Sequence, residues 1–127
     1  MKRCNIIGTN INVTTMEDTL NEIKKNLSSI KGNYICVSNV HTTVMAHENS
    51  DYKIIQNSSY MSLPDGKPLS IVSKRKGFKK AERVTGPDLM GEVFRISQKE
   101  GYTHYFYGST ENTLQDLKKN LKKNILS

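Results

Sequence analysis

The sequence is poor in the residues that mark several common functional classes. It has only two cysteines, Cys4 and Cys36, and both lie in short apolar runs. Two such cysteines do not supply a disulfide framework, so we expect buried free thiols in a reducing cytoplasm. The three histidines, His41, His47 and His104, show no metal-ligand spacing with each other or with the cysteines. This pattern argues against a zinc site, and we expect no metal ion.

Longer signatures are missing as well. No apolar run approaches the length of a transmembrane helix, and the basic start Met1–Arg3 is not followed by the uninterrupted apolar core of a signal peptide. The sequence contains neither a Walker P-loop nor the G-x-S-x-G elbow of hydrolases. Around Gly108 only one glycine of the dinucleotide fingerprint is present, so we expect no NAD site and no cofactor.

Positive charge is in excess. The 127 residues carry 19 Lys and Arg against 12 Asp and Glu, a net charge of +7, and 35% of the residues are hydrophobic. This composition predicts one modest domain spanning residues 1–127, with anionic partners. The runs Lys74–Lys80 and Lys118–Lys123 indicate either solvated faces or contact with anionic lipid. A nucleic-acid-binding domain is a third reading of the charge, but no recognition motif supports it and we expect no nucleic acid.

Apolar periodicity predicts alternating strands and helices. We expect strands at residues 4–7, 10–13, 34–37, 60–63 and 102–107, and helices at 16–28, after His41, through Ile54 and Ile55, at 67–75, at 87–99 and around Leu114–Leu121. The alternation from Tyr34 onward is typical of a parallel sheet with right-handed crossovers. The expected fold is therefore α/β, a Rossmann-like parallel sheet with helices on both faces.

Polar residues follow three of the expected strands. They are Ser38–His41, Pro64–Gly66 and Gly108–Thr110. Because the carboxyl ends of parallel strands meet at one edge of a sheet, these segments can converge on one cleft, with Asp65 as an acid/base carboxylate. Arg83 and Thr85-Gly86 precede a helix start, where backbone N–H groups favour anions. The set suits transfer from a substrate with a phosphorylated leaving group.

Each of these signals has a structural alternative. Pro64-Asp65-Gly66 is also ordinary turn chemistry, and Asn39 and His41 are also plausible helix-capping residues.

Four segments together resemble the bacterial WecG/TagA/CpsF glycosyltransferase family over nearly the whole chain. They are Asn39 with His41, Leu63-Pro64-Asp65-Gly66, Arg83-Val84-Thr85-Gly86-Pro87-Asp88-Leu89 and Tyr105-Phe106-Tyr107-Gly108-Ser109. The combination of P-D-G with R-V-x-G-x-D-L at this separation is fairly specific. One polar position of the family pattern, two residues before the pocket asparagine, is Val37 here.

The resemblance implies an inverting, metal-independent transfer of an N-acetylhexosamine-type sugar, such as N-acetylmannosamine. The donor is a UDP-sugar, and the acceptor is a polyprenyl-diphosphate-linked saccharide of teichoic acid or exopolysaccharide synthesis. It implies that Asp65 is the general base, and that Asn39, His41 and Arg83 bind substrate. Thr85, Gly86, Gly108 and Ser109 are implied to lie near the nucleotide sugar.

The resemblance also implies a cytoplasmic protein with peripheral contact at the inner face of the cell membrane, and it leaves homo-oligomers possible. Family members continue beyond the segment matched here, so the chain is expected to correspond to their N-terminal portion. The alternative is a non-catalytic nucleotide- or lipid-binding module that keeps the fold but has lost the chemistry.

Overall fold

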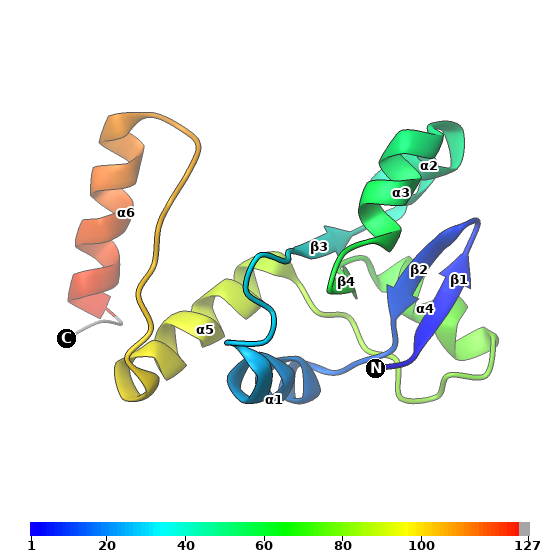
Figure 1. Cartoon of the computed structure of the whole chain (residues 1–127), viewed down its shortest axis with the longest axis horizontal. Coiled ribbons are helices and arrows are strands. Elements are labelled where there is room, and N and C mark those ends of the chain that lie inside the picture. Colours follow the sequence, from blue (N-terminus) through cyan, green and yellow to red (C-terminus); the bar gives the residue numbers. More distant parts are fainter. Residues whose placement is uncertain (125–127) are drawn as a thin grey trace. The chain divides into compact units, whose positions relative to one another are not determined.

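The computed structural model describes residues 1–124 and shows a mixed α/β chain, which confirms the expected fold class (Figure 1). In chain order the elements are β1 (Arg3–Ile6), β2 (Thr9–Asn12), α1 (Met16–Asn26), β3 (Ile35–Ser38), α2 (Val40–Glu48), α3 (Ser50–Asn57), β4 (Met61–Pro64), α4 (Lys67–Arg75), α5 (Gly86–Glu100) and α6 (Glu111–Asn124). The chain divides into two compact units, Met1–Leu89 and Met90–Ser127, with the boundary inside α5.

The first unit contains two small sheets. β1 and β2 form an antiparallel hairpin with Cys4 opposite Ile11, and its turn places Ile7 and Gly8 at positive φ. β3 and β4 pair in parallel with Cys36 opposite Ser62, and the helices α2 and α3 connect them. This parallel pair with a helical crossover is compatible with a Rossmann-like arrangement.

The core of the first unit lies where α4 covers the hairpin. Cys4, Ile6, Ile11 and Leu69 form a buried apolar cluster, and Val13, Val72 and Phe78 pack against it. The four residues of β4 are all buried, whereas Ile35, Cys36 and Val37 of β3 are only half-buried. β4 is therefore the interior strand, and β3 is closer to the surface than its continuous apolar run predicts.

Local sequence explains where the first helix begins. Thr15 is the N-cap of α1, and its hydroxyl accepts a hydrogen bond from the Asp18 N–H at 3.1 Å. Glu17 and Asp18 lie in the first turn, while Lys24 and Lys25 lie in the last, as the helix dipole favours.

A buried polar network joins the two parallel strands. The Ser38 and Ser62 hydroxyls lie 2.7 Å apart, and Ser38 Oγ donates to Gln56 Oε1 of α3 at 2.9 Å. On the other side of β4, the Ser62 N–H donates to Asn12 Oδ1 of β2 at 2.7 Å. Side chains thus complete hydrogen bonds that a wider sheet would make through its backbone.

The second unit corrects one expectation. Residues 102–107 alternate between half-buried and exposed side chains, but they are not a strand. His104 and Phe106 pack on Phe94 of α5 with ring centroids 4.9 and 5.8 Å away, and Ser97 Oγ lies 2.7 Å from His104 Nε2. The alternation therefore reflects packing against a helix: within residues 1–124, this segment has no ladder partner.

Candidate active site

The ends of β3 and β4 lie side by side, as the sequence predicts. The Asp65 N–H donates to Ser38 O at 2.8 Å and so extends the parallel pairing by one residue beyond β4. Asn39 follows directly on β3. A side chain at Gly66 would lie 3.8 Å from both Cα and Cβ of Asn39, so the two exits are in contact. Asn39 and Asp65 are therefore brought together by the strand register.

Arg83 is positioned beside Asp65 by a backbone hydrogen bond. The Val84 N–H donates to Pro64 O at 2.8 Å, which holds the segment before α5 along β4. Arg83 Nε donates to Asp65 O at 2.8 Å, and its guanidinium lies 3.9 Å from Asp65 Oδ1. Because the side chains of Arg83 and Asp65 are 56% and 24% exposed, this ion pair adds little stability, and guanidinium N–H groups remain for a ligand.

Three helix N-termini meet around these residues. Asn39 is the N-cap of α2 and forms a capping box with Thr42. Gly66 is the N-cap of α4, which has no side-chain cap. At the start of α5, the Thr85 hydroxyl accepts from the Asp88 N–H at 3.1 Å, and Gly86 lies so close to β3 that an added Cβ would be 3.5 Å from Val37 Cγ2. Helix N-termini present unpaired N–H groups and a positive dipole end, which favour an anion such as a diphosphate.

The structure places the predicted residues as follows. Asn39, Asp65, Arg83, Thr85 and Gly86 lie together at the exits of β3 and β4.

The remaining predicted residues are His41, Gly108 and Ser109. His41 is exposed in the first turn of α2. Gly108 and Ser109 belong to the second unit, where both have positive φ just before α6. Their role, and that of His41, stays a prediction.

The capping alternative for Asn39 is confirmed, whereas its binding role stays a prediction. Its Oδ1 accepts from the Thr42 N–H at 2.9 Å, and the Asn39 N–H donates to Thr42 Oγ1 at 3.0 Å. The cap does not use Nδ2 of the exposed Asn39 side chain, so this amide can still donate to a ligand. A capping role and a binding role are compatible in one side chain.

Two buried residues that hydrogen-bond to β3 and β4 near the site were not predicted from the sequence. Gln56 and Asn12 are buried, and they hold Ser38 and Ser62, which lie one residue before Asn39 and three before Asp65. The only sequence signal was indirect, because Ser62 interrupts the apolar run Tyr60–Leu63. A buried polar residue inside a strand requires a partner, but the sequence does not say which residue supplies it.

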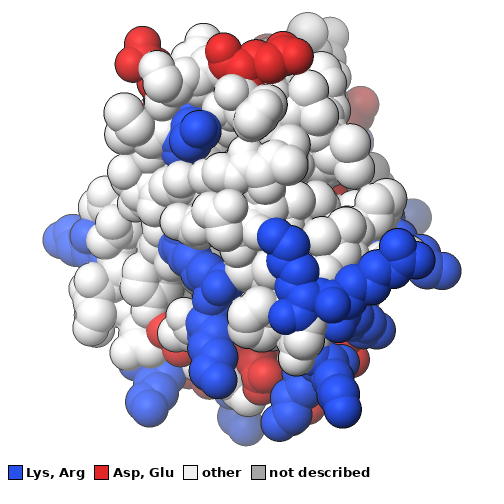
Figure 2. Space-filling model, turned by 90° about the vertical axis from the view of Figure 1, so that its right-hand side faces the viewer, with Lys and Arg blue, Asp and Glu red and all other residues white. Residues whose placement is uncertain are grey.

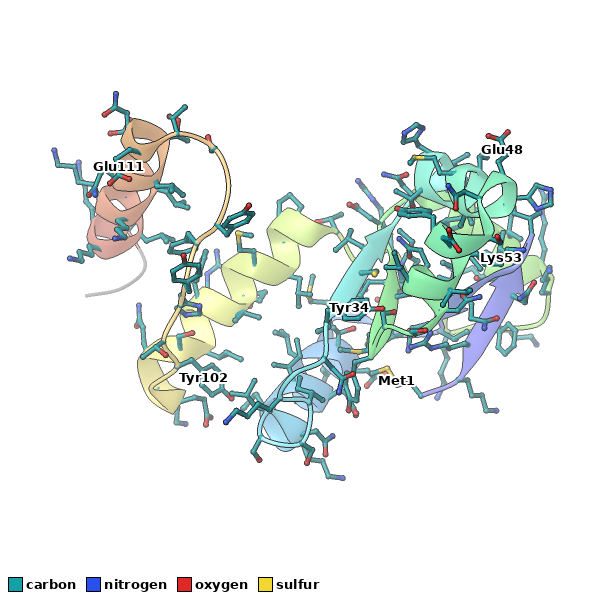
Figure 3. All side chains as sticks on the ribbon, turned by 45° about the horizontal axis from the view of Figure 1, so that its top comes forward. Met1, Tyr34, Glu48, Lys53, Tyr102 and Glu111 are labelled. Carbon is teal, nitrogen blue, oxygen red and sulfur yellow. The ribbon has the colours of Figure 1, made fainter. Side chains whose placement is uncertain are left out.

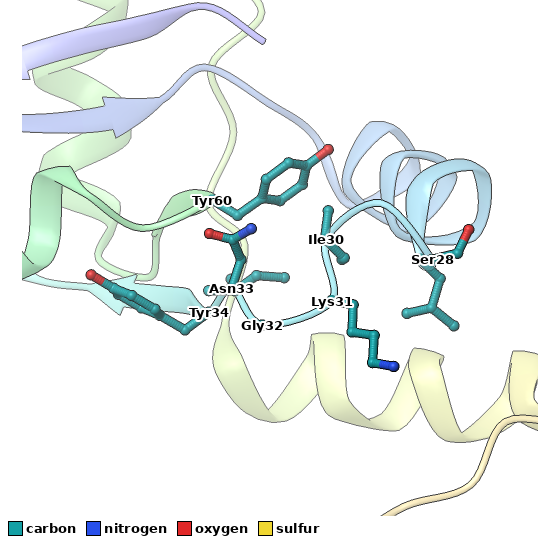
Figure 4. Close-up of a pocket in the computed structure, with 9 residues that line it drawn as sticks. Ser28, Ile30, Lys31, Gly32, Asn33, Tyr34 and Tyr60 are labelled. Carbon is teal, nitrogen blue, oxygen red and sulfur yellow. The ribbon is translucent and has the colours of Figure 1, made fainter.

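A separate hollow lies at the other end of β3. It has a volume of about 490 Å³ and is lined by residues of the α1–β3 connection, including Leu27, Ile30, Gly32 and Tyr34, together with Tyr60 (Figure 4). Tyr34 stands at the entrance to β3, and its hydroxyl donates to Ile55 O at 2.6 Å (Figure 3). The strand separates this mainly apolar hollow from Asp65.

Charge is spread unevenly over the face drawn in Figure 2. Lys and Arg gather over the lower half of the face in Figure 2, whereas its upper half is mostly uncharged with acidic groups at the upper edge.

Within residues 1–124, no group of three or more His, Cys, Asp or Glu side chains is placed to hold a metal ion. Over that same range, no helix combines the length and the apolar character that crossing a membrane requires.

Comparison with known proteins identifies the family of this chain. The sequence model of the glycosyl transferase WecG/TagA/CpsF family matches residues 4–126. One relative is the N-acetylglucosaminyldiphosphoundecaprenol N-acetyl-beta-D-mannosaminyltransferase of Bacillus spizizenii strain W23, which is 26% identical over 99 residues. The match covers 78% of this chain and 38% of that relative, so the chain spans well under half the relative's length. On the family match, this chain belongs to the WecG/TagA/CpsF family of glycosyltransferases.

Proposed function

We propose that the protein transfers an N-acetylhexosamine-type sugar, such as N-acetylmannosamine, from a UDP donor to a polyprenyl-diphosphate-linked saccharide in the synthesis of teichoic acid or exopolysaccharide. The observation that carries the proposal is the meeting of Asp65 and Arg83 with three helix N-termini at one sheet edge. This arrangement pairs a carboxylate that accepts a proton with cationic and dipolar groups that hold a diphosphate. The name of the Bacillus spizizenii relative supplies the kind of sugar and acceptor.

In the proposed reaction Asp65 is the general base. The acceptor hydroxyl attacks the anomeric carbon of the donor sugar while the Asp65 carboxylate takes its proton. The bond from the anomeric carbon to the diphosphate oxygen breaks, and UDP leaves with the electron pair. Attack from the face opposite UDP inverts the anomeric configuration.

The neighbouring groups act on the leaving diphosphate. In this proposal Arg83 places its free guanidinium N–H groups against it, and the backbone N–H groups at Thr85 and Gly86 bind it without a metal ion. Asn39 donates through Nδ2, and His41 in the first turn of the same helix completes this side of the donor pocket. These oriented donors stabilise the negative charge that develops on the leaving oxygen. Such stabilisation is usually a large part of the rate enhancement in sites of this kind.

We further propose that the protein works at the inner face of the membrane, where a lipid-linked acceptor resides. The exposed basic residues of Lys74–Lys80 support this placement, because five of the seven carry positive charge. The second candidate is a non-catalytic nucleotide-binding module. It would use Arg83 and the same helix N-termini, which bind an anionic ligand without transferring a sugar.

The test separates binding from transfer. Purified protein is titrated with UDP and with UDP-N-acetylmannosamine by calorimetry, and sugar transfer to a short-chain polyprenyl-diphosphate N-acetylglucosamine acceptor is followed by mass spectrometry. The proposal expects donor binding, weakened in Arg83→Gln, together with a product heavier by one N-acetylhexosamine residue. Binding without any product would favour the non-catalytic module, and the absence of both would refute the assignment.

A further inference from the structure

A buried chain of hydrogen bonds in the first unit ties the ends of β3 and β4 to Gln56 of α3. Ser38 and Ser62 are 0% exposed, and Gln56 is 4% exposed. Ser38 Oγ donates to Gln56 Oε1 at 2.9 Å. Because a hydroxyl has a single hydrogen, the Ser62 hydroxyl, 2.7 Å away, donates to Ser38 Oγ in turn. Gln56 Nε2 donates to the Tyr52 hydroxyl at 3.0 Å, which keeps Oε1 turned toward the serines.

The neighbouring residues hold the backbone of Gln56 in place. Asn57 Oδ1 accepts from the Asn10 N–H at 2.8 Å, and Asn57 Nδ2 donates to Gly8 O at 2.9 Å, so the end of α3 is fastened to the β1–β2 hairpin. Ser59 Oγ donates to the Gln56 carbonyl at 2.7 Å. The Gln56 side chain therefore starts from a backbone position that does not depend on its bonds to the two serines.

The network lies on the face of β3 opposite the proposed diphosphate site. An added Cβ at Gly86, the start of α5, would be 3.5 Å from Val37 Cγ2, so Val37 faces α5. Ser38 follows Val37, and successive side chains of a strand point to opposite faces. The backbone of β3 thus separates Gln56 from a ligand held at the start of α5. Any effect of Gln56 on the reaction has to pass through the strands.

We propose that Gln56 is a positioning residue that sets the placement of Asn39 relative to Asp65, an inference that rests on the function proposed above. Ser38 directly precedes Asn39. Ser62 lies three residues before Asp65. Without the Gln56 acceptor, one of the two buried serine hydroxyls loses its partner, and the strand ends have to shift to give it another.

The proposed diphosphate-binding groups follow β4 in such a shift. The Val84 N–H donates to Pro64 O and Arg83 Nε donates to Asp65 O, both at 2.8 Å. A shift between β3 and β4 therefore leaves Arg83 beside Asp65 and displaces Asn39 from both. Misplacement of one group by about 1 Å costs up to about 100-fold in rate, whereas one lost neutral hydrogen bond costs only a few-fold in affinity.

The first experiment compares turnover with donor affinity. Gln56→Met replaces the carboxamide by an apolar group of similar length. Ile6→Ala is the control, because it removes buried side-chain atoms from the apolar cluster between the hairpin and α4 and lowers Tm at least as much. We expect Gln56→Met to lower kcat for transfer from UDP-N-acetylmannosamine about 10–100-fold, with the Kd of UDP within about fivefold of wild type. Ile6→Ala should keep both values, measured well below its Tm.

A conservative variant tests whether the acceptor oxygen matters. In either protonation state Gln56→Glu offers an acceptor to Ser38, and the Tyr52 hydroxyl can pair with its other oxygen. We expect Gln56→Glu to recover most of the kcat that Gln56→Met loses. If Gln56 only filled space, methionine would serve at least as well as glutamate. Turnover of Gln56→Met within threefold of wild type, or of Gln56→Glu no higher than Gln56→Met, contradicts the proposal. If Gln56→Met does not fold, Ser38→Ala removes the same hydrogen bond and should show the same loss of kcat.

Hydrogen exchange separates this inference from the proposed function. The Asp65 N–H donates to Ser38 O at 2.8 Å, so its exchange reports on the contact between the two strand ends. We expect NMR to show faster exchange of this N–H in Gln56→Met than in wild type or Ile6→Ala. Unchanged exchange at Asp65 refutes the positioning role, whereas a wild type that neither binds UDP nor transfers sugar refutes the proposed function. For a chain that binds UDP without transfer, the exchange at Asp65 decides alone.

Discussion

Asn12 offers a sharp test of how the site is supported. Its Oδ1 accepts the Ser62 N–H at 2.7 Å, and the two residues are 2% and 0% exposed. In Asn12→Ala the Ser62 N–H loses its acceptor and is too deeply buried for water to replace it. β4 leads from Ser62 to Asp65 in three residues, so the same hydrogen bond fixes the strand that presents the proposed base.

The expected loss follows from that unpaired donor. A buried group left without its hydrogen bond costs about 1–3 kcal/mol, and removal of the amide leaves a small void beside it. We therefore expect Asn12→Ala to lower the free energy of unfolding by about 2 kcal/mol. For a domain of this size, that corresponds to a fall in Tm of roughly 5–10 °C.

Urea unfolding followed by circular dichroism measures the change. Asn10→Ala is the matched control, since Asn10 lies in the same strand and its Oδ1 accepts only from the exposed Asn5 amide. We expect the control to change stability by less than about 0.5 kcal/mol. Equal effects of the two substitutions would refute the argument that the bond to Ser62 stabilises β4.

Three further predictions concern other parts of the chain. Asn39→Ala should lose about 1 kcal/mol with the α2 cap, whereas Asn39→Asp should keep the cap and stability but bind UDP-sugar more weakly in calorimetry. The hydrogen bond to Glu22 raises the pKa of Tyr60 above its ordinary value of 10.0. The stabilisation of the fold by this hydrogen bond is therefore complete below about pH 10 and is lost as pH rises through the raised pKa. The difference in unfolding free energy between wild type and Tyr60→Phe, measured in urea, should vanish at alkaline pH. Sedimentation with anionic vesicles should fall steeply with salt and with Lys79→Gln/Lys80→Gln, and equal binding to neutral vesicles would exclude the electrostatic account.

Much of the fold follows from local patterns in the sequence. The helices α1, α4, α5 and α6 occur close to where apolar spacing and capping residues predict them. The strand ends at Ser38 and Pro64 follow from abrupt stops in apolar runs, and their proximity follows from the parallel connection. Those two facts were sufficient to bring Asn39 together with Asp65.

Long-range partners were not predictable in the same way. The alternation in Tyr102–Tyr107 indicates which side chains are covered, but not whether a strand or the helix residue Phe94 covers them. The alternation Asn10–Val13 predicts a half-buried strand, yet Asn12 is buried. Its side-chain Oδ1 accepts the hydrogen bond from the Ser62 N–H that the backbone of a neighbouring strand would otherwise accept. Periodicity indicates which side chains of one segment are buried. It does not identify their hydrogen-bond partners, and for Asn12 the partner Ser62 is 50 residues away in the sequence.

The central claim is that Asp65 acts as the base in sugar transfer, and Asp65→Asn tests it most directly. The substitution keeps the size of the side chain and removes its basicity. General-base assistance is worth about 10²–10⁴-fold in rate, so we expect kcat for transfer from UDP-N-acetylmannosamine to fall on that scale while donor affinity changes little. Turnover of Asp65→Asn within a few-fold of wild type would contradict the assignment, and would leave Pro64-Asp65-Gly66 as a turn that only connects β4 to α4.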